Sequence, residues 1–237
     1  SMACKFFIDQ ENTIRGTKIV IIDPAATAAS QPEYKRMCEK KRGAYISFSK
    51  DSKNIPAIMG LHTGDFLEDI FAIEHVLSVM LGGEQGITKA QEPWLEKAIL
   101  MAFEMVGINA ANPASWKNTP PRLDKLKIAL TKLFREAKSE NSRMSIEALL
   151  SRLSRFTGDG MYSFIDQSGS ELKLDNSFTV FEFKNTPSQI RETLTAIVMN
   201  YVKAKSMSNL DRTIIVLEEA PLWLKHAVLA DFLSTMI

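Results

Sequence analysis

The chain is poor in cysteine, in long apolar runs and in excess charge. Its two cysteines, Cys4 and Cys38, lack the spacing of a zinc site or a disulfide framework, which favours packed thiols in a reducing, cytoplasmic compartment. No apolar run approaches the ~20 residues that a membrane-spanning helix needs. The 29 basic side chains are balanced by 28 acidic ones, so no overall field draws the chain to a polyanion. A local patch could still bind nucleic acid, and direct nucleic-acid binding stays open.

What is present is typical of a soluble globular protein with one large or two small domains: 237 residues, 45% of them hydrophobic. Residues 3–15 are expected to form a helix that ends at Gly16. Four apolar runs, near 18–22, 44–48, 178–183 and 213–217, predict strands with helices between them. Both faces of the 178–183 run are apolar, which places it inside the sheet. The fold class is therefore α/β with a mostly parallel sheet.

Between 66 and 157 the apolar residues recur at helical spacing instead. The pattern predicts a helix from Phe66 to the Gly82-Gly83 pair, and Thr88 and Gln91 have the form of a capping box that opens a second helix. Two further amphipathic stretches follow, with apolar stripes at 123–134 and 146–156. We expect an all-helical insertion over 66–157, which divides the α/β part into 3–65 and 158–237.

The most informative stretch is "TIIVLEEAPLWL", residues 213–224, in which an apolar strand ends on Glu218 and Glu219. In an open parallel sheet the ligand crevice lies beyond the carboxyl ends of the strands, and Asp23 ends another strand. Nucleotide hydrolases use such a pair: one carboxylate holds magnesium, usually through water, and its neighbour orients the attacking water. An alternative stays open on this pattern alone, because two acids also favour the positive end of a following helix.

The order of the segments carries a family resemblance. "KIVIID", "EYKRMCEKKRGAYISFS", a helical insertion, "LDNSFTVFEFKN", "IRETLTAIVMNYV" and "RTIIVLEEAPLWLK" together resemble the large ATPases of type IV secretion and conjugative DNA transfer, from about Lys5 onward. The resemblance implies a RecA-like P-loop NTPase sheet with an all-α insertion, in which the strand before Glu218 is the Walker B strand.

The resemblance also implies the chemistry and the setting. Glu219 is then the catalytic residue, and Glu218 holds Mg²⁺ through water. The cofactors are ATP and Mg²⁺. The family's motors self-associate, as hexamers, and work with other secretion components at the inner face of the bacterial inner membrane, in the cytoplasm.

Two departures from the family pattern stand out. Glu218 occupies the position where the family has aspartate, so this carboxylate is one methylene longer. No "GxxxxGK[ST]" motif occurs in the 237 residues, and Lys5 cannot replace its lysine because no glycine-rich turn precedes it. We therefore expect a chain that begins just after a P-loop, with no cofactor-binding loop of its own and no ATP hydrolysis by itself. The alternatives are a non-hydrolysing scaffold relative, a DNA-translocase-type motor, and an α/β interaction module whose glutamates only begin a helix.

Overall fold

The fold is described from a computed structural model of residues 1–237. The structure describes residues 2–23, 34–52, 54–167, 172, 174–183, 185–208, 212–218 and 230. Glu219, the expected catalytic residue, lies outside the described residues. Every statement below concerns the described part of the chain.

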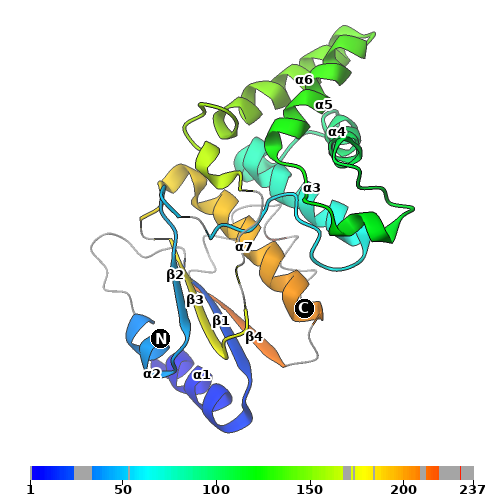
Figure 1. The fold of residues 1–237 in the computed structure, drawn as a ribbon. Coiled ribbons are helices and arrows are strands. Elements are labelled where there is room, and N and C mark those ends of the chain that lie inside the picture. Colours follow the sequence, from blue (N-terminus) through cyan, green and yellow to red (C-terminus); the bar gives the residue numbers. More distant parts are fainter. Residues whose placement is uncertain are drawn as a thin grey trace.

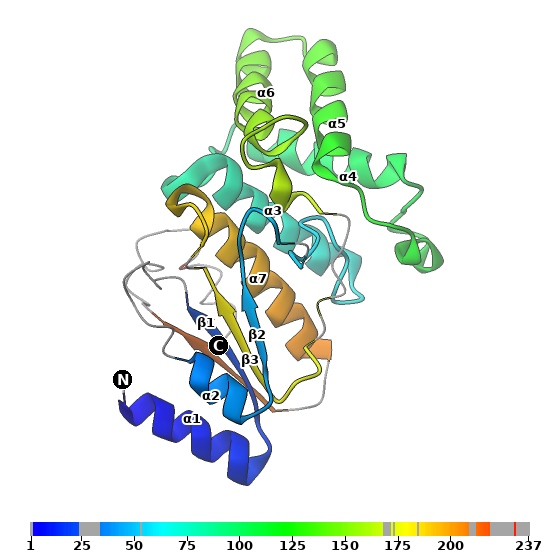
Figure 2. The ribbon, with the colours of Figure 1, turned by 60° about the vertical axis from the view of Figure 1, so that its left-hand side comes forward.

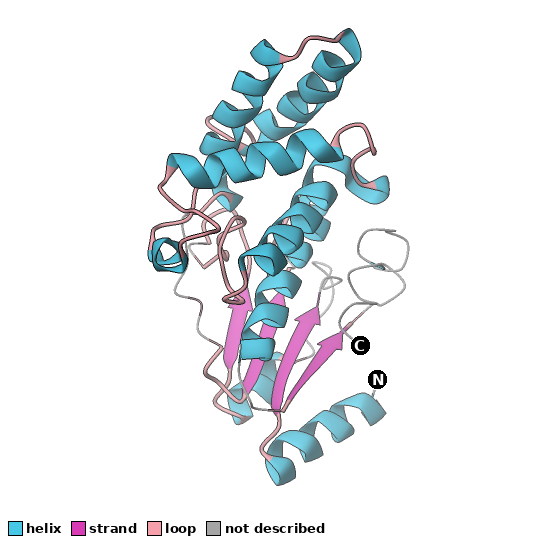
Figure 3. Cartoon of the chain, turned by 90° about the vertical axis from the view of Figure 1, so that its right-hand side faces the viewer, coloured by secondary structure: helices cyan, strands magenta, loops and turns pink. Residues whose placement is uncertain are grey.

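Four strands form one parallel sheet, in the order β2-β3-β1-β4. Their bounds are β1 Lys18–Asp23, β2 Ala44–Ser47, β3 Phe178–Glu182 and β4 Thr213–Leu217. Figure 3 shows all four strands running in the same direction. The α/β class and the four strand positions are thus confirmed, and β3 is an inner strand with every residue buried.

The strands on either side of the last crossover helix are parallel but are not neighbours. β1 lies between β3 and β4, and β3 lies between β1 and β2. The connections from β1 to β2 and from β3 to β4 therefore each skip one strand, whereas the connection from β2 to β3 joins neighbours. Residues 19–22 of β1 are all buried and apolar, so both faces of this strand need to be covered. A strand of this kind is typical of the interior of a sheet, which agrees with the position of β1 between two other strands.

Helices cover both faces of the sheet (Figures 1 and 2). On one face lie α1, Met2–Arg15, and α2, Lys35–Lys40, which share an apolar cluster with Ile19, Ile21 and Val180. On the other face lies α7, Ser188–Ser208, whose apolar side chains join a cluster with Val20 and Phe181. Because side chains alternate along a strand, each face of the sheet has its own core.

The structure describes every residue from 66 to 157, and none of them is in a strand. The elements of this segment are α3 Phe66–Gly82, η1 Gly83–Gln85, α4 Glu92–Met105, η2 Pro113–Lys117, α5 Leu123–Glu136, α6 Glu140–Leu153 and η3 Ser154–Phe156, with η4 Ser163–Ile165 following. α3 lies beside α7 in both views (Figures 1 and 2), and its apolar residues belong to the same core as α7. The segment is continuous with the sheet's core, and the division into three domains stays a prediction.

The second helix of this segment begins later than the capping box suggested. Residues 88–91 form a turn, in which the Gln91 side chain accepts a hydrogen bond from the backbone N–H of Thr88 at 3.0 Å. α4 starts at Glu92, with Pro93 in its first positions. Proline is best placed in the first turn of a helix because it has no N–H to donate, and its position explains the later start.

A search of the described helices for a segment long and apolar enough to cross a membrane finds none.

Candidate functional site

A row of polar residues crosses the sheet where its strands end. Ser47 on β2 is the register partner of Glu182 on β3, and Glu182 is the partner of Asp23 on β1. Glu218 continues the row beyond β4, because its N–H donates to the carbonyl of Ile22 at 3.1 Å. Register partners in a parallel sheet point to the same face, so Ser47, Glu182, Asp23 and Glu218 are neighbours on one side of the sheet.

The row lies on the α1 and α2 face. Two residues before the row, Ile21 and Val180 belong to the buried cluster that those helices cover, and the partly buried Tyr45 and Val216 pack against it. The strand ends, where apolar packing stops, are thus lined by three carboxylates on adjacent strands. This is the edge at which open parallel sheets bind ligands.

Glu218 is held by a residue from a distant part of the chain. The hydroxyl of Tyr34, which immediately precedes α2, donates a hydrogen bond to Oε1 of Glu218. The Tyr34 side chain is buried, with 2% of its surface exposed, whereas Glu218 is partly exposed. Lys5, in the first turns of α1, lies with its ammonium 5.3 Å from the centre of the Tyr34 ring. These contacts connect the beginning of α1 to the carboxyl end of β4.

Glu182 is the most buried acid of the row, with 3% of its surface exposed. Its Oε2 accepts a hydrogen bond from the Ser47 hydroxyl at 2.6 Å. Its Oε1 is buried without a hydrogen-bond partner in the part of the chain that the structure describes. A buried carboxylate oxygen without a donor is costly, so a water or a ligand is the natural partner of this atom.

The row has an electrostatic effect on Tyr45, two residues before Ser47. Burial, together with the negative charges of Glu182 and Asp23, raises the pKa of Tyr45 to about 12. No group of three or more histidine, cysteine, aspartate or glutamate side chains in the described ranges is close enough to hold a metal ion directly.

The sequence identified part of this arrangement. It placed Glu218 and Asp23 at the same edge of the sheet, and the register brings them side by side. It missed Glu182, although this acid interrupts the apolar run "FTVFEF" and was visible for that reason. It also missed Tyr34, since nothing in the charged stretch around that residue indicates a contact 184 residues away.

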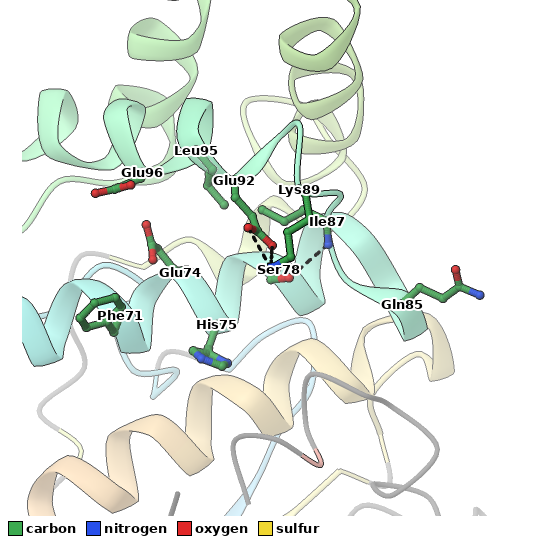
Figure 4. Close-up of a pocket in the computed structure, with 10 residues that line it drawn as sticks. All are labelled: Phe71, Glu74, His75, Ser78, Gln85, Ile87, Lys89, Glu92, Leu95 and Glu96. Atoms are coloured by element: carbon green, nitrogen blue, oxygen red, sulfur yellow. Dashed lines mark hydrogen bonds and ion pairs between the residues drawn. The ribbon is translucent and has the colours of Figure 1, made fainter. Parts of the chain in front are cut away.

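A cavity of about 560 Å³ lies in the helical segment, between α3 and α4 (Figure 4). Glu74 of α3 and Glu96 of α4 point toward one another there, while Lys89 pairs with Glu92 at 3.1 Å. Burial raises the pKa of Glu74 to about 7, and the charges of Glu96 and Glu92 act in the same direction. The ten residues that line the cavity all come from 71–96, so it is separate from the strand-end row.

Comparison with solved structures supports the fold. The chain is similar to VirB4 of Thermoanaerobacter pseudethanolicus, with a TM-score of 0.72 and 21% sequence identity. The match covers 99% of this chain and 63% of the VirB4 chain, so the present sequence spans less than two thirds of the protein that it resembles. No curated protein matches the sequence.

The family is shown by a match along nearly the whole sequence. Residues 2–237 match the model of the TraG P-loop domain. This match confirms the resemblance to the ATPases of type IV secretion and conjugative transfer that the order of segments indicated, although the 237 residues contain no glycine-rich P-loop motif. The chain belongs to the TraG P-loop domain family.

Proposed function

We propose that this chain is part of an ATPase that drives type IV secretion or conjugative transfer of DNA or protein. The observation that carries the proposal is the set of contacts from Lys5 through Tyr34 to Glu218. Phosphate groups bind at helix N-termini, and Walker B acids follow a buried strand. In this chain the first turns of α1 and the acid after β4 are brought together across the α1 and α2 face of the sheet.

In this proposal the phosphate-binding loop precedes α1 in a longer protein. Glu218 would hold Mg²⁺ through water, and Glu219 would orient the water that attacks the γ-phosphate. Mg²⁺ keeps several water ligands and takes few carboxylates, which agrees with a strand end whose described acids do not form a direct ligand cluster. When bound, Mg²⁺ would neutralise charge that develops on the phosphates. The acids of this chain would orient the water molecules bound to the Mg²⁺ ion.

We also propose that the longer protein self-associates, as a hexamer, and works in a larger complex at the inner face of the bacterial inner membrane. The match to the TraG P-loop domain supports this setting. The test is light scattering of the longer protein with and without Mg²⁺-ATP. A protein that stays monomeric in both conditions would contradict the hexamer.

The experiment that tests the ATPase compares a protein that includes the preceding glycine-rich loop with the 237-residue chain. We expect saturable ATP hydrolysis only from the longer protein, because loop N–H groups and a lysine supply most of the phosphate binding. In that protein Glu219→Gln should preserve ATP binding and lower kcat by about 10²-fold or more, since the attacking water is no longer activated. Glu218→Ala should weaken Mg²⁺-dependent ATP binding.

The readouts are steady-state hydrolysis and calorimetric ATP binding. Unchanged turnover in Glu219→Gln, or hydrolysis by the 237-residue chain at the rate of the longer protein, would exclude this assignment. A longer protein that binds ATP and never hydrolyses it would instead identify a non-hydrolysing relative.

A further inference from the structure

We propose that Tyr34 is a positioning residue that fixes how the Glu218 carboxylate faces the Mg²⁺-bound waters of the nucleotide site. The inference rests on the proposed function, in which Glu218 holds Mg²⁺ through water. Tyr34 itself touches neither the nucleotide nor the metal. It acts through the hydrogen bond from its hydroxyl to Oε1 of Glu218.

Tyr34 is rigidly placed for this task. Its ring is 2% exposed and belongs to the apolar cluster of Ile19, Ile21 and Val180, the residues beneath the polar row. Lys5 lies over the ring at 5.3 Å, within the range of a cation–π attraction. A phenol held on one side by the sheet and on the other by α1 has little freedom to turn away from Glu218.

Glu218 needs such a partner more than an aspartate would. A glutamate side chain has one more rotatable bond than the aspartate of the family pattern, so its carboxylate reaches further and samples more orientations. A hydrogen bond to a charged group is stronger than one between neutral groups, and this one fixes one carboxylate oxygen. The hydrogen bond from Tyr34 therefore limits the orientations that the Glu218 carboxylate can sample.

The main test uses the longer protein that includes the glycine-rich loop. Tyr34→Phe keeps the buried ring and removes only the hydroxyl. We expect the Mg²⁺ concentration for half-maximal binding of a fluorescent ADP analogue to rise about tenfold, the loss expected for one charge-assisted hydrogen bond. Binding measured without Mg²⁺ should stay within about twofold of wild type, because the phosphate loop is unchanged.

The matched control is Tyr201→Phe. Tyr201 is also buried, with 6% exposed, and its hydroxyl also donates a hydrogen bond, to the carbonyl of Leu172. It lies in α7 on the opposite face of the sheet. Its loss should lower stability without moving the Mg²⁺ dependence, which separates positioning of Glu218 from a general loss of packing.

A double-mutant cycle tests whether Tyr34 acts through Glu218. In a Glu218→Asp background the shorter carboxylate withdraws from Tyr34, so Tyr34→Phe should change the Mg²⁺ dependence by less than about twofold. Glu218→Ala reports on the proposed function itself. If Glu218→Ala shifts the Mg²⁺ dependence and Tyr34→Phe does not, this inference is wrong and the proposed function stands. If Glu218→Ala has no effect, the metal role of Glu218 fails as well.

A second measurement needs only the 237-residue chain. Its four tyrosines can be labelled at Cζ with carbon-13, and the Tyr34 resonance can be assigned by its absence in Tyr34→Phe. We expect Glu218→Ala to shift the Tyr34 resonance and to leave that of Tyr162 in place. A Tyr34 resonance that does not respond to Glu218→Ala would show that the contact is absent in solution and would overturn the inference.

Discussion

Asp23 and Glu182 lie side by side at the ends of two neighbouring parallel strands, because they are register partners of β1 and β3. Both point to the face that α1 and α2 cover. Glu182 is buried and has one oxygen on Ser47, while its other oxygen has no partner among the residues that the structure describes. Asp23 is half-buried, whereas the buried charge of Glu182 costs folding free energy that further donors, water or a ligand must offset.

Replacing Glu182 by glutamine should therefore not weaken the folded 237-residue chain. The amide keeps an oxygen for the Ser47 hydroxyl, removes a negative charge beside Asp23 and offers an N–H in its place. We expect the free energy of unfolding to rise by about 1 kcal/mol. Urea denaturation at neutral pH measures it. Ser47→Ala is the contrasting variant and should cost about 1–2 kcal/mol, since it removes a hydrogen bond to a buried carboxylate.

If Glu182→Gln destabilises the chain by as much as Ser47→Ala, the Glu182 carboxylate has a compensating partner and its negative charge does not destabilise the folded chain. In the longer protein a stabilising Glu182→Gln that also lowers turnover would indicate a trade of stability for function at this edge.

The Glu74 carboxyl should make stability depend on pH. Its folded pKa is raised from an ordinary value of 4.5 to about 7, first by burial and then by Glu96 and Glu92. Because the pKa of Glu74 is higher in the folded chain than in the unfolded chain, its contribution to the free energy of unfolding is fully present below pH 4.5 and is lost as the pH rises to about 7. After allowance for solvent screening we expect a loss of about 1–2 kcal/mol.

Glu74→Gln should remove that part of the pH dependence. Urea unfolding at pH 5 and pH 8 gives the difference, and the variant should be more stable than wild type at pH 8. Glu104→Gln is the control, because Glu104 is an exposed acid of α4 outside the cavity lining. Equal pH slopes for wild type and Glu74→Gln would mean that Glu74 titrates normally.

His62 should act in the opposite direction. Its pKa is lowered from 6.5 to about 4, first by burial and then by the charge of Lys205. Because the pKa of His62 is lower in the folded chain than in the unfolded chain, its contribution to the free energy of unfolding is fully present above pH 6.5 and is lost as the pH falls toward 4. The ring meets Tyr201 edge-on at 5.1 Å between centroids, so His62→Phe keeps an aromatic ring there and cannot titrate.

We expect wild type to lose about 1–2 kcal/mol of its free energy of unfolding relative to His62→Phe as the pH falls from 6.5 to 4.5. Thermal or urea denaturation at a series of pH values measures this difference. A difference that stays constant across the range would show that His62 is protonated as easily in the folded chain as in the unfolded one.

The sequence predicted elements better than their arrangement. Apolar runs and helical spacing located the strands and the helices, because burial imposes those periods directly. The spacing of apolar residues in a crossover helix does not indicate which strand the next strand in the sequence will pair with. The position of β1 between β3 and β4 could therefore not be predicted from the sequence. Glu182, Asp23 and Glu218 form one row because of the sheet order together with the register of each strand pair.

Local polar patterns were also ambiguous. Thr186 lies two residues before α7, yet its hydroxyl donates to the carbonyl of Phe48, 138 residues away, at 3.1 Å. Tyr34 is likewise defined by its distant partner. A polar side chain can satisfy a nearby backbone group or a distant one, and the fold decides between them.

Asp166 makes two contacts that substitutions can separate. Its Oδ1 accepts a hydrogen bond from the backbone N–H of Leu123 at 3.0 Å, and its Oδ2 accepts one from Nε of Arg122 at 3.3 Å. Asp166 and Leu123 are buried, but 54% of the Arg122 side chain is exposed. The first contact satisfies an N–H at the start of α5, and the second is an ion pair that water screens.

Asp166→Asn keeps an oxygen for Leu123 and loses only the ion pair, so it should cost about 0.5 kcal/mol, as should Arg122→Ala. Asp166→Ala leaves the buried N–H of Leu123 without an acceptor and should cost about 2–3 kcal/mol. Urea denaturation of the three variants separates the two contacts. If Asp166→Asn is as damaging as Asp166→Ala, the negative charge itself stabilises the start of α5 and the two contacts are not separable.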